Sequence, residues 1–356
     1  MKAWVLHDIG DIQFNEKEIP VPKENEVLIK VMAAGICGSD IPRIYDTGTH
    51  NMPLVPGHEF AGMVEGIGKN VPSSWMGKRV AAYPRIACGS CKECLGGRYD
   101  RCMDYDYIGS RRDGAFAEYV TVPQMNLLPL PAPVSFEEGA MLEPMAVAAN
   151  AVRRFMGMPV AKDRPVAVCG LGPIGLMVVM FLKEAGYKDV FVIGNKDAHR
   201  ERADSLGVPA ERYYDSRMGN AEELIRKDTD GGAAAYFECV GKNECIVCGL
   251  EITSPGGQVI LVGNPYSDMI ISRDAYWQIL RKQLTVSGIW NSSFLQEALP
   301  DGSPDDWHYV LQRLTNGEID PKTLISHRLG LEGLEQGIVM MRDKTGDYCK
   351  VMMVMK

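Results

Sequence analysis

The strongest indication of fold in this sequence is the stretch Val166-Ala167-Val168-Cys169-Gly170-Leu171-Gly172-Pro173-Ile174-Gly175. It opens with an apolar, strand-like run, and a helical pattern from Leu176 to Ala185 follows it directly. Glycines spaced Gly-x-Gly-x-x-Gly in this context give a tight turn and let the backbone approach a pyrophosphate at the free N–H groups that begin a helix. The stretch therefore predicts a dinucleotide site made by Gly170, Gly172, Pro173, Ile174 and Gly175.

Strands and helices alternate from Pro165 onward, and this alternation is the signature of a parallel sheet covered by helices. We therefore predict a Rossmann domain, with a doubly wound parallel sheet, over residues 148–290. The later elements that we expect in it are the strand 235–239, the helix 245–253, the strand 258–263, the helix 274–282 and the strand 284–289.

The end of the predicted strand Val190–Ile193 bears on which dinucleotide binds. An acid at this point would hydrogen-bond the ribose hydroxyls of NAD, but the sequence reads Gly194-Asn195-Lys196. Without the acid a 2′-phosphate meets no repulsion, and Lys196 and Arg200 add positive charge while Asn195 adds an amide donor. We therefore expect NADP in preference to NAD. The alternative is that Asp197 or a shifted strand end supplies the acid.

Residues 1–147 are predicted to form a β-rich domain. Strand patterns occur at residues 3–6 and 26–34, and glycines interrupt a further strand pattern between Gly62 and Gly68. Glycines inside a strand indicate bulges or sharp bends, which suit a small barrel-like sheet.

A helix is predicted to follow Ser135, which we expect to be its N-cap. Pro144 is expected to break or restart that helix, because proline removes a backbone donor. The rhythm of strands and helices is lost after Asn291, and we expect residues 291–356 to return to the first domain.

Cysteines are clustered in one short segment, where Cys88, Cys91, Cys94 and Cys102 follow the pattern Cys-x2-Cys-x2-Cys-x7-Cys. Thiolates this close in sequence can surround one zinc ion and leave no coordination position open. Such a site is structural, because its binding energy contributes to folding. An iron–sulfur cluster is the alternative, and chance clustering is the third interpretation.

Candidate ligands for a second metal are scattered along the chain, at Cys37, His58, Glu59 and Glu143. A thiolate, an imidazole and a carboxylate hold zinc and can leave one position open, as catalytic sites require. Because these residues are distant in sequence, an ordinary His–Glu pair is the alternative interpretation of the motif.

Arg111 and Arg112 are adjacent, between two glycines. A guanidinium there could bind an oxyanion through two parallel hydrogen bonds, and a solvated surface pair is the alternative. The cysteines outside the proposed sites have apolar neighbours, and we expect buried thiols even for the Cys-x-x-Cys pair. These are Cys169, Cys239, Cys245, Cys248 and Cys349.

Length and charge restrict the class of protein. A chain of 356 residues is longer than one core normally serves, so two domains are expected. A net charge of −8 argues against nucleic acid as a partner, because phosphate backbones require a basic surface. The N-terminus lacks the apolar core of a signal peptide and no apolar run is long enough for a membrane span, so we expect a cytoplasmic protein without a membrane partner.

In combination, these motifs resemble those of the zinc-dependent medium-chain dehydrogenases over essentially the full length of the chain. Within that family the chain is similar to the polyol branch, and more narrowly to its members that act on galactitol 1-phosphate. The narrower similarity lies in residues 37–45, 105–119 and 279–290. The motifs in order are Cys37-Gly38-Ser39-Asp40, Gly57-His58-Glu59, the four cysteines, Glu143-Pro144 and the glycine turn.

The resemblance implies an α/β fold in which a GroES-like catalytic domain accompanies the Rossmann domain. It implies two zinc ions per chain, the catalytic one held by Cys37, His58 and Glu143 with Glu59 in or near the first shell. Ser39 would begin the proton relay, with Glu59 as the second catalytic side chain.

The substrate implied by the resemblance is a small polyol or polyol phosphate, with galactitol 1-phosphate preferred. Arg43 aligns where relatives acting on free sorbitol have an aromatic hydroxyl, which favours an anionic substrate. The residues expected at the substrate site are Arg43, Arg111, Arg112, Trp290 and Asn291. A free polyol such as sorbitol or xylitol and L-threonine are the alternatives. A zinc-less oxidoreductase, a regulatory protein on this scaffold and a nucleic-acid-binding zinc module are the other classes, and a homodimer or homotetramer is expected.

Overall fold

The computed structural model describes residues 1–157, 162–219, 221–296 and 302–355. The chain forms two compact units, of which unit 1 is Met1–Pro144 with Ser293–Lys356 and unit 2 is Met145–Ser292. Each unit contains its own sheet, and the predicted α/β fold is confirmed. No helix in the described ranges combines the length and the apolar character that a bilayer crossing needs.

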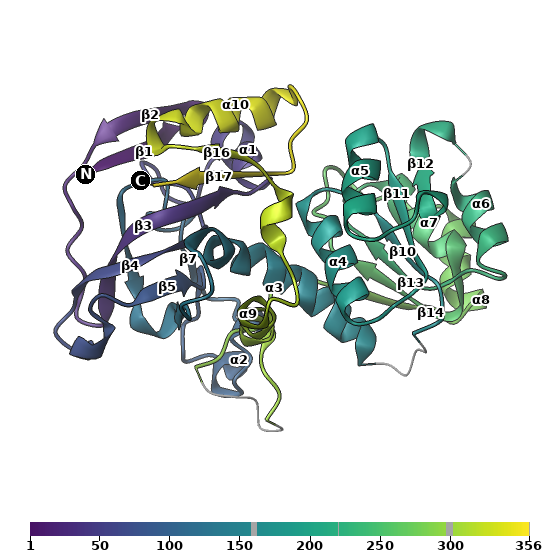
Figure 1. Cartoon of the computed structure of the whole chain (residues 1–356), viewed down its shortest axis with the longest axis horizontal. Coiled ribbons are helices and arrows are strands. Elements are labelled where there is room, and N and C mark those ends of the chain that lie inside the picture. Colours follow the sequence, from purple (N-terminus) through teal and green to yellow (C-terminus); the bar gives the residue numbers. More distant parts are fainter. Residues whose placement is uncertain (158–161, 220, 297–301, 356) are drawn as a thin grey trace. The chain divides into compact units, whose positions relative to one another are not determined.

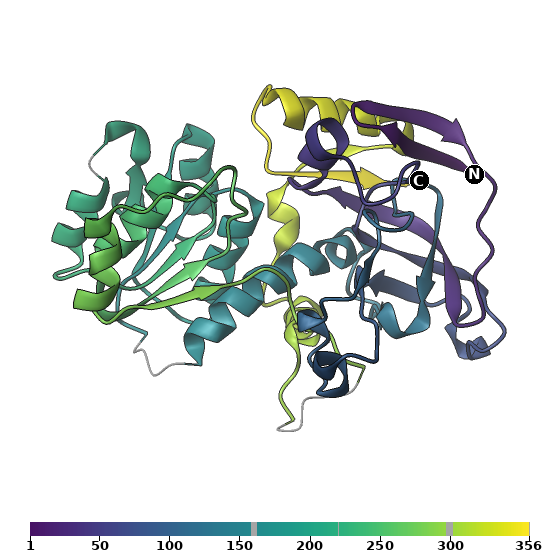
Figure 2. The same ribbon diagram turned by 180° about the vertical axis from the view of Figure 1, so that it is seen from behind.

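Unit 2 contains a six-stranded, wholly parallel sheet in the order β12-β11-β10-β13-β14-β15. Figures 1 and 2 show helices on both faces, with α4 and α5 on one side and α6, α7 and α8 on the other. Its central strands are buried along their whole length, which explains their continuous apolar runs. The strands are β10 (Val166–Cys169), β11 (Val190–Gly194), β12 (Tyr213–Asp215), β13 (Ala233–Glu238), β14 (Thr253–Leu261) and β15 (Thr285–Gly288), and the helices are α4 (Pro173–Glu184), α5 (Asp197–Ser205), α6 (Ala221–Asp228), α7 (Asn243–Ile252) and α8 (Arg273–Arg281).

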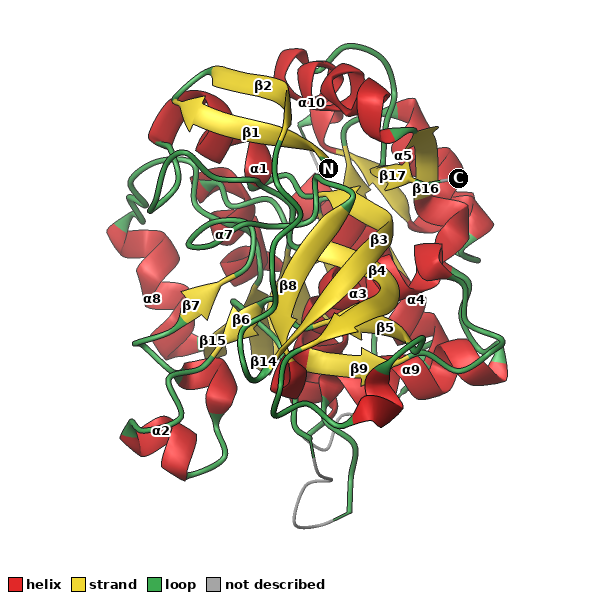
Figure 3. Ribbon diagram, turned by 90° about the vertical axis from the view of Figure 1, so that its left-hand side faces the viewer, coloured by secondary structure: helices red, strands yellow, loops and turns green. Residues whose placement is uncertain are grey.

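Unit 1 is built on a seven-stranded sheet around β3 (Glu26–Ile36), and Figure 3 shows β8 beside β3 in this sheet. β3 pairs antiparallel with β4, β8 and β17, so a strand from the end of the chain lies beside one from its beginning. The other strands of this sheet are β4 (Glu59–Ile67), β5 (Arg79–Ala82), β8 (Tyr119–Pro123), β9 (Leu127–Pro129), β16 (Ile325–Leu329) and β17 (Lys350–Val354).

Smaller elements of unit 1 cover this sheet. The C-terminal helix α10 (Leu334–Asp343) buries Leu334 and Ile338 in the same apolar core as Val351 of β17. The remaining elements are the paired strands β1 (Lys2–Asp8) and β2 (Asp11–Glu16), the paired strands β6 (Arg85–Ile86) and β7 (Asp106–Tyr107), and the helices α1 (Asp40–Pro42), α2 (Lys92–Leu95) and α9 (Asp306–Asn316).

The glycines of β4 accompany the irregularities that the sequence predicts. The register between β3 and β4 shifts at Leu28/Ile29 and at Val31/Ala33. At Gly62 a side chain has no room, because a Cβ there would lie 2.1 Å from the main-chain oxygen of Lys30. The close approach of two backbones therefore requires glycine at this position.

Helix α3 (Phe136–Met156) corrects the expectation that Pro144 breaks the helix, because it continues through the proline. A proline inside a helix costs about 3 kcal/mol. Fully buried neighbours on both sides, including Leu142 and Met145, offset that cost, since each such side chain contributes about 1.5–3 kcal/mol. The predicted N-cap is confirmed, since the Ser135 hydroxyl accepts the Glu138 N–H at 3.2 Å and the Glu138 carboxylate accepts the Ser135 N–H at 2.7 Å.

Candidate functional site

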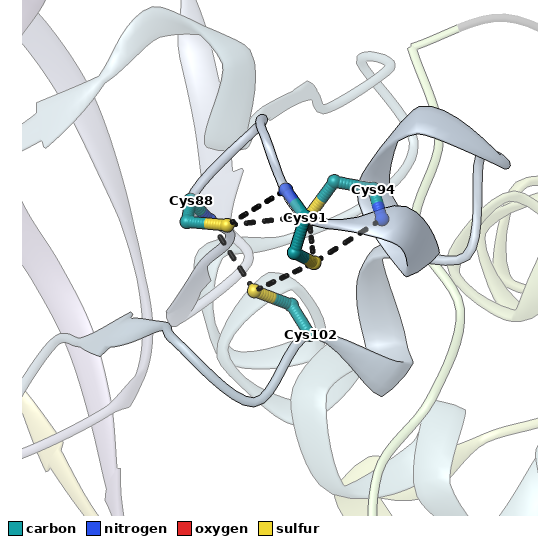
Figure 4. A group of neighbouring side chains, drawn as sticks. All are labelled: Cys88, Cys91, Cys94 and Cys102. Atoms are coloured by element: carbon teal, nitrogen blue, oxygen red, sulfur yellow. Dashed lines mark hydrogen bonds between the residues drawn. The ribbon is translucent and has the colours of Figure 1, made fainter.

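The four predicted thiols of the segment Cys88–Cys102 converge on one point, as Figure 4 shows. Their sulfur atoms lie within 4.8 Å of one another, with Sγ distances of 3.4 Å for Cys91–Cys94, 3.9 Å for Cys88–Cys94 and 3.9 Å for Cys91–Cys102. A zinc tetrahedron with bonds of about 2.3 Å separates its sulfurs by about 3.8 Å. The arrangement thus fits a single metal ion, whereas the irons of a cluster would hold the sulfurs farther apart.

The local fold favours thiolates in this lobe. Backbone N–H groups, that of Ser90 first, lower the pKa of Cys88 to about 6. The Cys91 sulfur accepts the Cys94 N–H at 3.5 Å and caps α2. Burial acts in the opposite direction on Cys94 and raises the pKa of its thiol to about 12. A bound cation would offset that burial, because thiolates are the metal-binding form.

A second group of metal-ligand atoms, which we call the Cys37 group, comprises Cys37, His58 and Glu59. Their ligand atoms lie within 4.8 Å of one another. Strand topology brings them together. Cys37 follows the end of β3, while His58 and Glu59 stand at the start of β4, which pairs antiparallel with β3 through Gly35 and Glu59. Antiparallel neighbours meet at the same end of a sheet, so residues distant in sequence converge there.

Two charged residues that the sequence reasoning missed complete this group. Lys350, the first residue of β17, forms a buried ion pair with Glu59, and Gly35 makes room for it because a Cβ there would meet both side chains. The carboxylate of Asp40 lies 3.2 Å from Nδ1 of His58. Burial opposes a charge on His58, but Asp40 raises the pKa of the imidazole well above its usual value.

Glu143 lies outside the group of mutually close atoms but belongs to the same surroundings. It is buried, and its Oε1 accepts the Tyr107 hydroxyl at 3.4 Å. The Tyr107 ring in turn packs edge-on against His58, with centroids 5.7 Å apart. Burial, with the nearby charge of Glu59 adding to it, raises the pKa of Glu143 to about 7 despite the opposing charge of His58. Tyr107 is a further side chain that the sequence reasoning did not assign.

Ser39 and Arg43 lie beside this group. The Ser39 hydroxyl donates to the Cys37 sulfur at 3.2 Å and accepts from Nη1 of Arg43 at 3.0 Å. Nη1 of Arg43 also lies 3.7 Å from Asp40. The residues Arg43–Thr47 continue α1 as a π-helical turn, which is a rare conformation that is frequent at functional sites.

The two adjacent arginines point to different partners. Arg112 donates to the Glu26 carboxylate at 2.8 Å and to Thr121, so its charge is used within the sheet framework. Arg111 lies over the Tyr105 ring and lines an open pocket of about 520 Å³ together with His50, Asp104 and Asp106. The structure therefore does not support the two arginines as one joint anion pocket.

Trp290 and Asn291 lie at the end of unit 2. Trp290 is 59% exposed. The main-chain oxygen of Asn291 accepts a hydrogen bond from Asn150 of α3 at 2.5 Å, and its side chain accepts the Ser292 N–H. The backbone at Asn291 is thus held to α3.

The glycine turn of unit 2 has the geometry that a dinucleotide site requires. Gly170 has a φ of +90°, and a Cβ on Gly175 would lie 1.8 Å from the Gly170 oxygen, so both positions need glycine. A Cβ on Gly172 would meet nothing within 4 Å, which leaves open space at the N-terminus of α4. Pro173 and Ile174 form the first turn of that helix, whose free N–H groups attract an anion.

The end of β11 contains no acid, and the structure shows what takes its place. A Cβ on Gly194 would lie 2.8 Å from the hydroxyl of Tyr213, so this phenol fills the room of a side chain. The Tyr213 hydroxyl donates to the Lys196 main-chain oxygen at 2.9 Å, and the guanidinium of Arg200 lies over its ring. Asp197 pairs instead with Arg217 at 2.9 Å.

Comparisons with known proteins point to the same family as the motifs. Residues 23–132 match the family described as alcohol dehydrogenase GroES-like domain, and residues 173–316 match zinc-binding dehydrogenase. Galactitol 1-phosphate 5-dehydrogenase of Escherichia coli K12 is 32% identical over 95% of both chains. The chain belongs to the zinc-dependent medium-chain dehydrogenases.

Other members of the medium-chain dehydrogenases are about equally similar. L-threonine 3-dehydrogenase of Bacillus subtilis 168 is 33% identical over 99% of this chain and 98% of its own. The crystal structure of the Escherichia coli galactitol-1-phosphate dehydrogenase has a TM-score of 0.88, with 31% identity over 99% of this chain and 100% of that one. A protein from Sinorhizobium meliloti 1021, solved bound to NADP, also has a TM-score of 0.88, with 28% identity over 99% and 98%. This medium-chain dehydrogenase is thus a zinc-dependent alcohol or polyol dehydrogenase that uses a nicotinamide cofactor on small-molecule substrates.

Proposed function

We propose that this enzyme oxidises a secondary alcohol of an anionic sugar alcohol, with galactitol 1-phosphate as the preferred substrate and NADP as the cofactor. One observation carries the proposal: the guanidinium of Arg43 lies 3.0 Å from the Ser39 hydroxyl, beside the Cys37 group. A substrate alcohol at Ser39 would have a positive charge next to it, which suits a phosphate on the same molecule. The similarity to the Escherichia coli enzyme supports the same substrate.

Two zinc ions per chain are part of the proposal. The lobe of Cys88, Cys91, Cys94 and Cys102 would hold the structural ion, because its sulfur spacing suits a closed tetrahedron. The catalytic ion would be held by Cys37 and His58 with Glu143, and Glu59 in or near its shell. When bound there, zinc acts as a Lewis acid that lowers the pKa of an alcohol.

The surrounding side chains supply position and proton transfer. Ser39 would take the alcohol proton and release its own hydroxyl proton toward the cofactor ribose and solvent, and the position of its hydroxyl between the Cys37 sulfur and Arg43 supports this role. The Asp40 carboxylate lies 3.2 Å from Nδ1 of His58, and a negative charge on that side of the ring would leave Nε2 for the metal. Lys350 offsets the charge of the buried Glu59.

The end of β11 supports the proposed preference for NADP. Gly194 removes the acid that would repel a 2′-phosphate, and Tyr213 closes the space that an acid would need. Lys196 and Arg200 lie beside that phenol and supply positive charge. The similar Sinorhizobium protein binds NADP, which supports the preference.

L-Threonine and free polyols are the second candidates. A threonine dehydrogenase is as similar in sequence as the galactitol 1-phosphate enzyme, and a guanidinium binds a carboxylate as readily as a phosphate. Free sorbitol or xylitol would need no positive charge beside Ser39.

A homo-oligomer, dimer or tetramer, is also proposed, and one face of unit 2 supports it. Strand β15 is the last strand of its sheet, with Val286 40% exposed. The adjoining helix α8 exposes Tyr276, Trp277 and Leu280. An open strand edge beside exposed apolar side chains can add a strand from a second copy.

We also propose that the enzyme works in the cytoplasm. None of the ten cysteines forms a disulfide, which suits a reducing compartment. A fluorescent fusion that enriched outside the cytoplasm would contradict this placement.

The test is a matrix of initial rates on galactitol 1-phosphate, galactitol, sorbitol and L-threonine, each with NADP and NAD. We expect the highest kcat/KM with galactitol 1-phosphate and NADP. Arg43→Gln should lower the ratio of kcat/KM for galactitol 1-phosphate to that for galactitol about 30-fold, because a charge-assisted contact to the phosphate is lost.

The control is Arg273→Gln, since this side chain on α8 is 90% exposed. It should leave every ratio unchanged. Equal or better rates on free polyols, or an unchanged ratio in Arg43→Gln, would overturn the anionic substrate. A preference for NAD would overturn the assignment of Gly194 and Tyr213.

A further inference from the structure

A buried carboxylate at the end of β13 has no place in the mechanism above. Glu238 is the last residue of that strand and is 1% exposed. Its Oε1 accepts the N–H of Val240 at 2.7 Å and the N–H of Gly241 at 2.8 Å. Burial raises the pKa of this carboxyl group, and hydrogen bonds from the backbone of Gly241 and Val240 oppose the shift. Because burying a carboxylate costs free energy, Glu238 is expected to have a role that offsets this cost.

Glu238 joins two loops that follow neighbouring parallel strands. Its own main-chain oxygen accepts the N–H groups of Val262 and Gly263, which follow β14, at 2.8 and 2.9 Å. Its Oε2 lies against Gly263, because a Cβ there would be 2.7 Å from that oxygen. One residue therefore binds loop 239–242 through its side chain and loop 262–264 through its backbone.

These two loops touch each other and the glycine turn with almost no free space. A Cβ on Gly241 would lie 1.8 Å from the Asn264 oxygen, and a Cβ on Gly263 would lie 2.2 Å from the Gly241 nitrogen. A Cβ on Gly170 would lie 2.4 Å from the Val240 side chain. The loops after β10, β13 and β14 are thus in backbone contact at the carboxyl edge of the sheet, where α/β sheets bind their ligands.

We infer that Glu238 is a positioning residue that preforms the cofactor site by holding loops 239–242 and 262–264 against the glycine turn. It acts through the backbone of these loops and does not itself touch the dinucleotide. The inference rests on the proposed cofactor site at Gly170–Gly175. A loop fixed before binding loses less entropy on binding, so the carboxylate should appear in cofactor affinity.

Both hydrogen bonds to loop 239–242 use one carboxylate oxygen, Oε1, while Oε2 faces Gly263. Glutamine has the same length but only one acceptor oxygen. If that oxygen keeps the bonds to Val240 and Gly241, its amide group must face Gly263, where a carboxylate oxygen lay. Aspartate keeps both oxygens but is one methylene shorter.

The experiment measures the Kd for NADPH by fluorescence titration of the zinc-loaded protein, together with the thermal midpoint and the split between kcat and cofactor KM. Glu238→Gln should raise both Kd and KM for the cofactor about tenfold while kcat at saturation stays within about threefold, because the bonds to Val240 and Gly241 lose the charge of their acceptor and an amide group faces Gly263. Glu238→Asp should restore part of the affinity.

The matched control is Glu138→Gln in unit 1. Glu138 is also a buried carboxylate that accepts a backbone N–H, from Ser135 at 2.7 Å. The Glu138→Gln substitution should lower the thermal midpoint without changing the affinity for the cofactor. If Glu238→Gln lowers the midpoint as the control does and leaves Kd within twofold of wild type, the role is structural and the inference is wrong.

The remaining outcomes are also decisive. If Glu238→Gln does not fold, Glu238→Asp decides by the same criterion, with a Kd raised about threefold in support and an unchanged Kd against. If the wild-type protein binds neither NADPH nor NADH, the proposed cofactor site itself is wrong, and this result is distinguishable because it precedes any substitution.

Discussion

The two metal-ligand groups of unit 1 are assembled in opposite ways. The four-cysteine lobe takes all its ligands from the segment Cys88–Cys102, within one loop and one turn of helix. The Cys37 group takes its ligands from the ends of β3 and β4, and Lys350 of β17 completes its charge. The first group can form as soon as its loop closes, whereas the second exists only after three strands pair in register.

This difference separates stability from chemistry. Ligands that are close in sequence hold a metal whose binding energy stabilises the fold. Ligands that are distant in sequence are instead held in place by the folded sheet. Their arrangement around the metal is therefore set by strand pairing and not by one short loop. The lobe should therefore contribute mainly to stability, and the Cys37 group mainly to the reaction.

The largest effect is expected for Cys37→Ser. Loss of this thiolate should lower kcat/KM about 1000-fold or more, because the Lewis acid loses a ligand. Zinc content should fall from two ions per chain to one, and the thermal midpoint should move little. Metal analysis, rates and thermal unfolding measure these three quantities.

A matched control for Cys37→Ser is Cys349→Ser, which alters a buried thiol in neither metal group. It should retain two zinc ions and normal turnover. A Cys37→Ser protein that turned over at the wild-type rate would end the assignment of the catalytic ligand group.

The next effect concerns Cys94→Ser in the lobe. Removal of one ligand from a closed zinc site should lower the free energy of unfolding by about 3 kcal/mol, a size comparable to the loss of other covalent or metal cross-links. The kcat of the molecules that remain folded should change less than threefold, roughly the limit for a residue outside the reaction. Chemical denaturation with active-site titration separates the two quantities, and unchanged stability would contradict a structural zinc.

These two groups also show what sequence alone could and could not predict. The spacing of four cysteines indicated a site because a short loop has few ways to separate its ligands. The alternation after Pro165 predicted the parallel sheet, since its strands are buried on both faces. The helix through Pro144 was predicted wrongly, because a local pattern shows the proline but not the full burial of Leu142 and Met145 beside it.

The site residues that the sequence did not predict are brought into place by the pairing of strands. Lys350 and Glu59 are distant in sequence, and the pairing of β3 with both β17 and β4 brings them together. Tyr213 meets Gly194 because β11 and β12 are parallel neighbours. The one local clue was Asp40, three residues after Cys37, whose short spacing could have indicated a partner for a metal-bound histidine.

A smaller effect is expected for Glu143→Ala, which tests whether Glu143 belongs to the ligand set of the Cys37 group. Glu143 is placed near Cys37, His58 and Glu59 but outside their closest contacts. Its loss should lower kcat/KM about 30-fold with the fold intact, since a metal-binding carboxylate is removed but other ligands remain. Tyr107→Phe, which removes only the hydroxyl that donates to Glu143 at 3.4 Å, should cost less. Normal turnover by Glu143→Ala would remove this residue from the ligand set.

The smallest effect is expected for a hydrogen bond in unit 1 that involves no metal ligand, and the quantity affected is the free energy of unfolding. His308 lies 2.7 Å from Asp305, and this hydrogen bond raises the pKa of the imidazole while burial opposes the shift. A raised folded-state pKa means that the stabilisation is fully present below pH 6.5 and is lost as the pH rises through the folded-state value. Because the side chain is 40% exposed, we expect only about 0.5 kcal/mol. Urea unfolding of the wild type and His308→Gln between pH 5 and 9 should show a difference in the free energy of unfolding that shrinks as the pH rises. A difference that stayed constant with pH would mean that packing against Phe294, rather than charge, holds His308 in place.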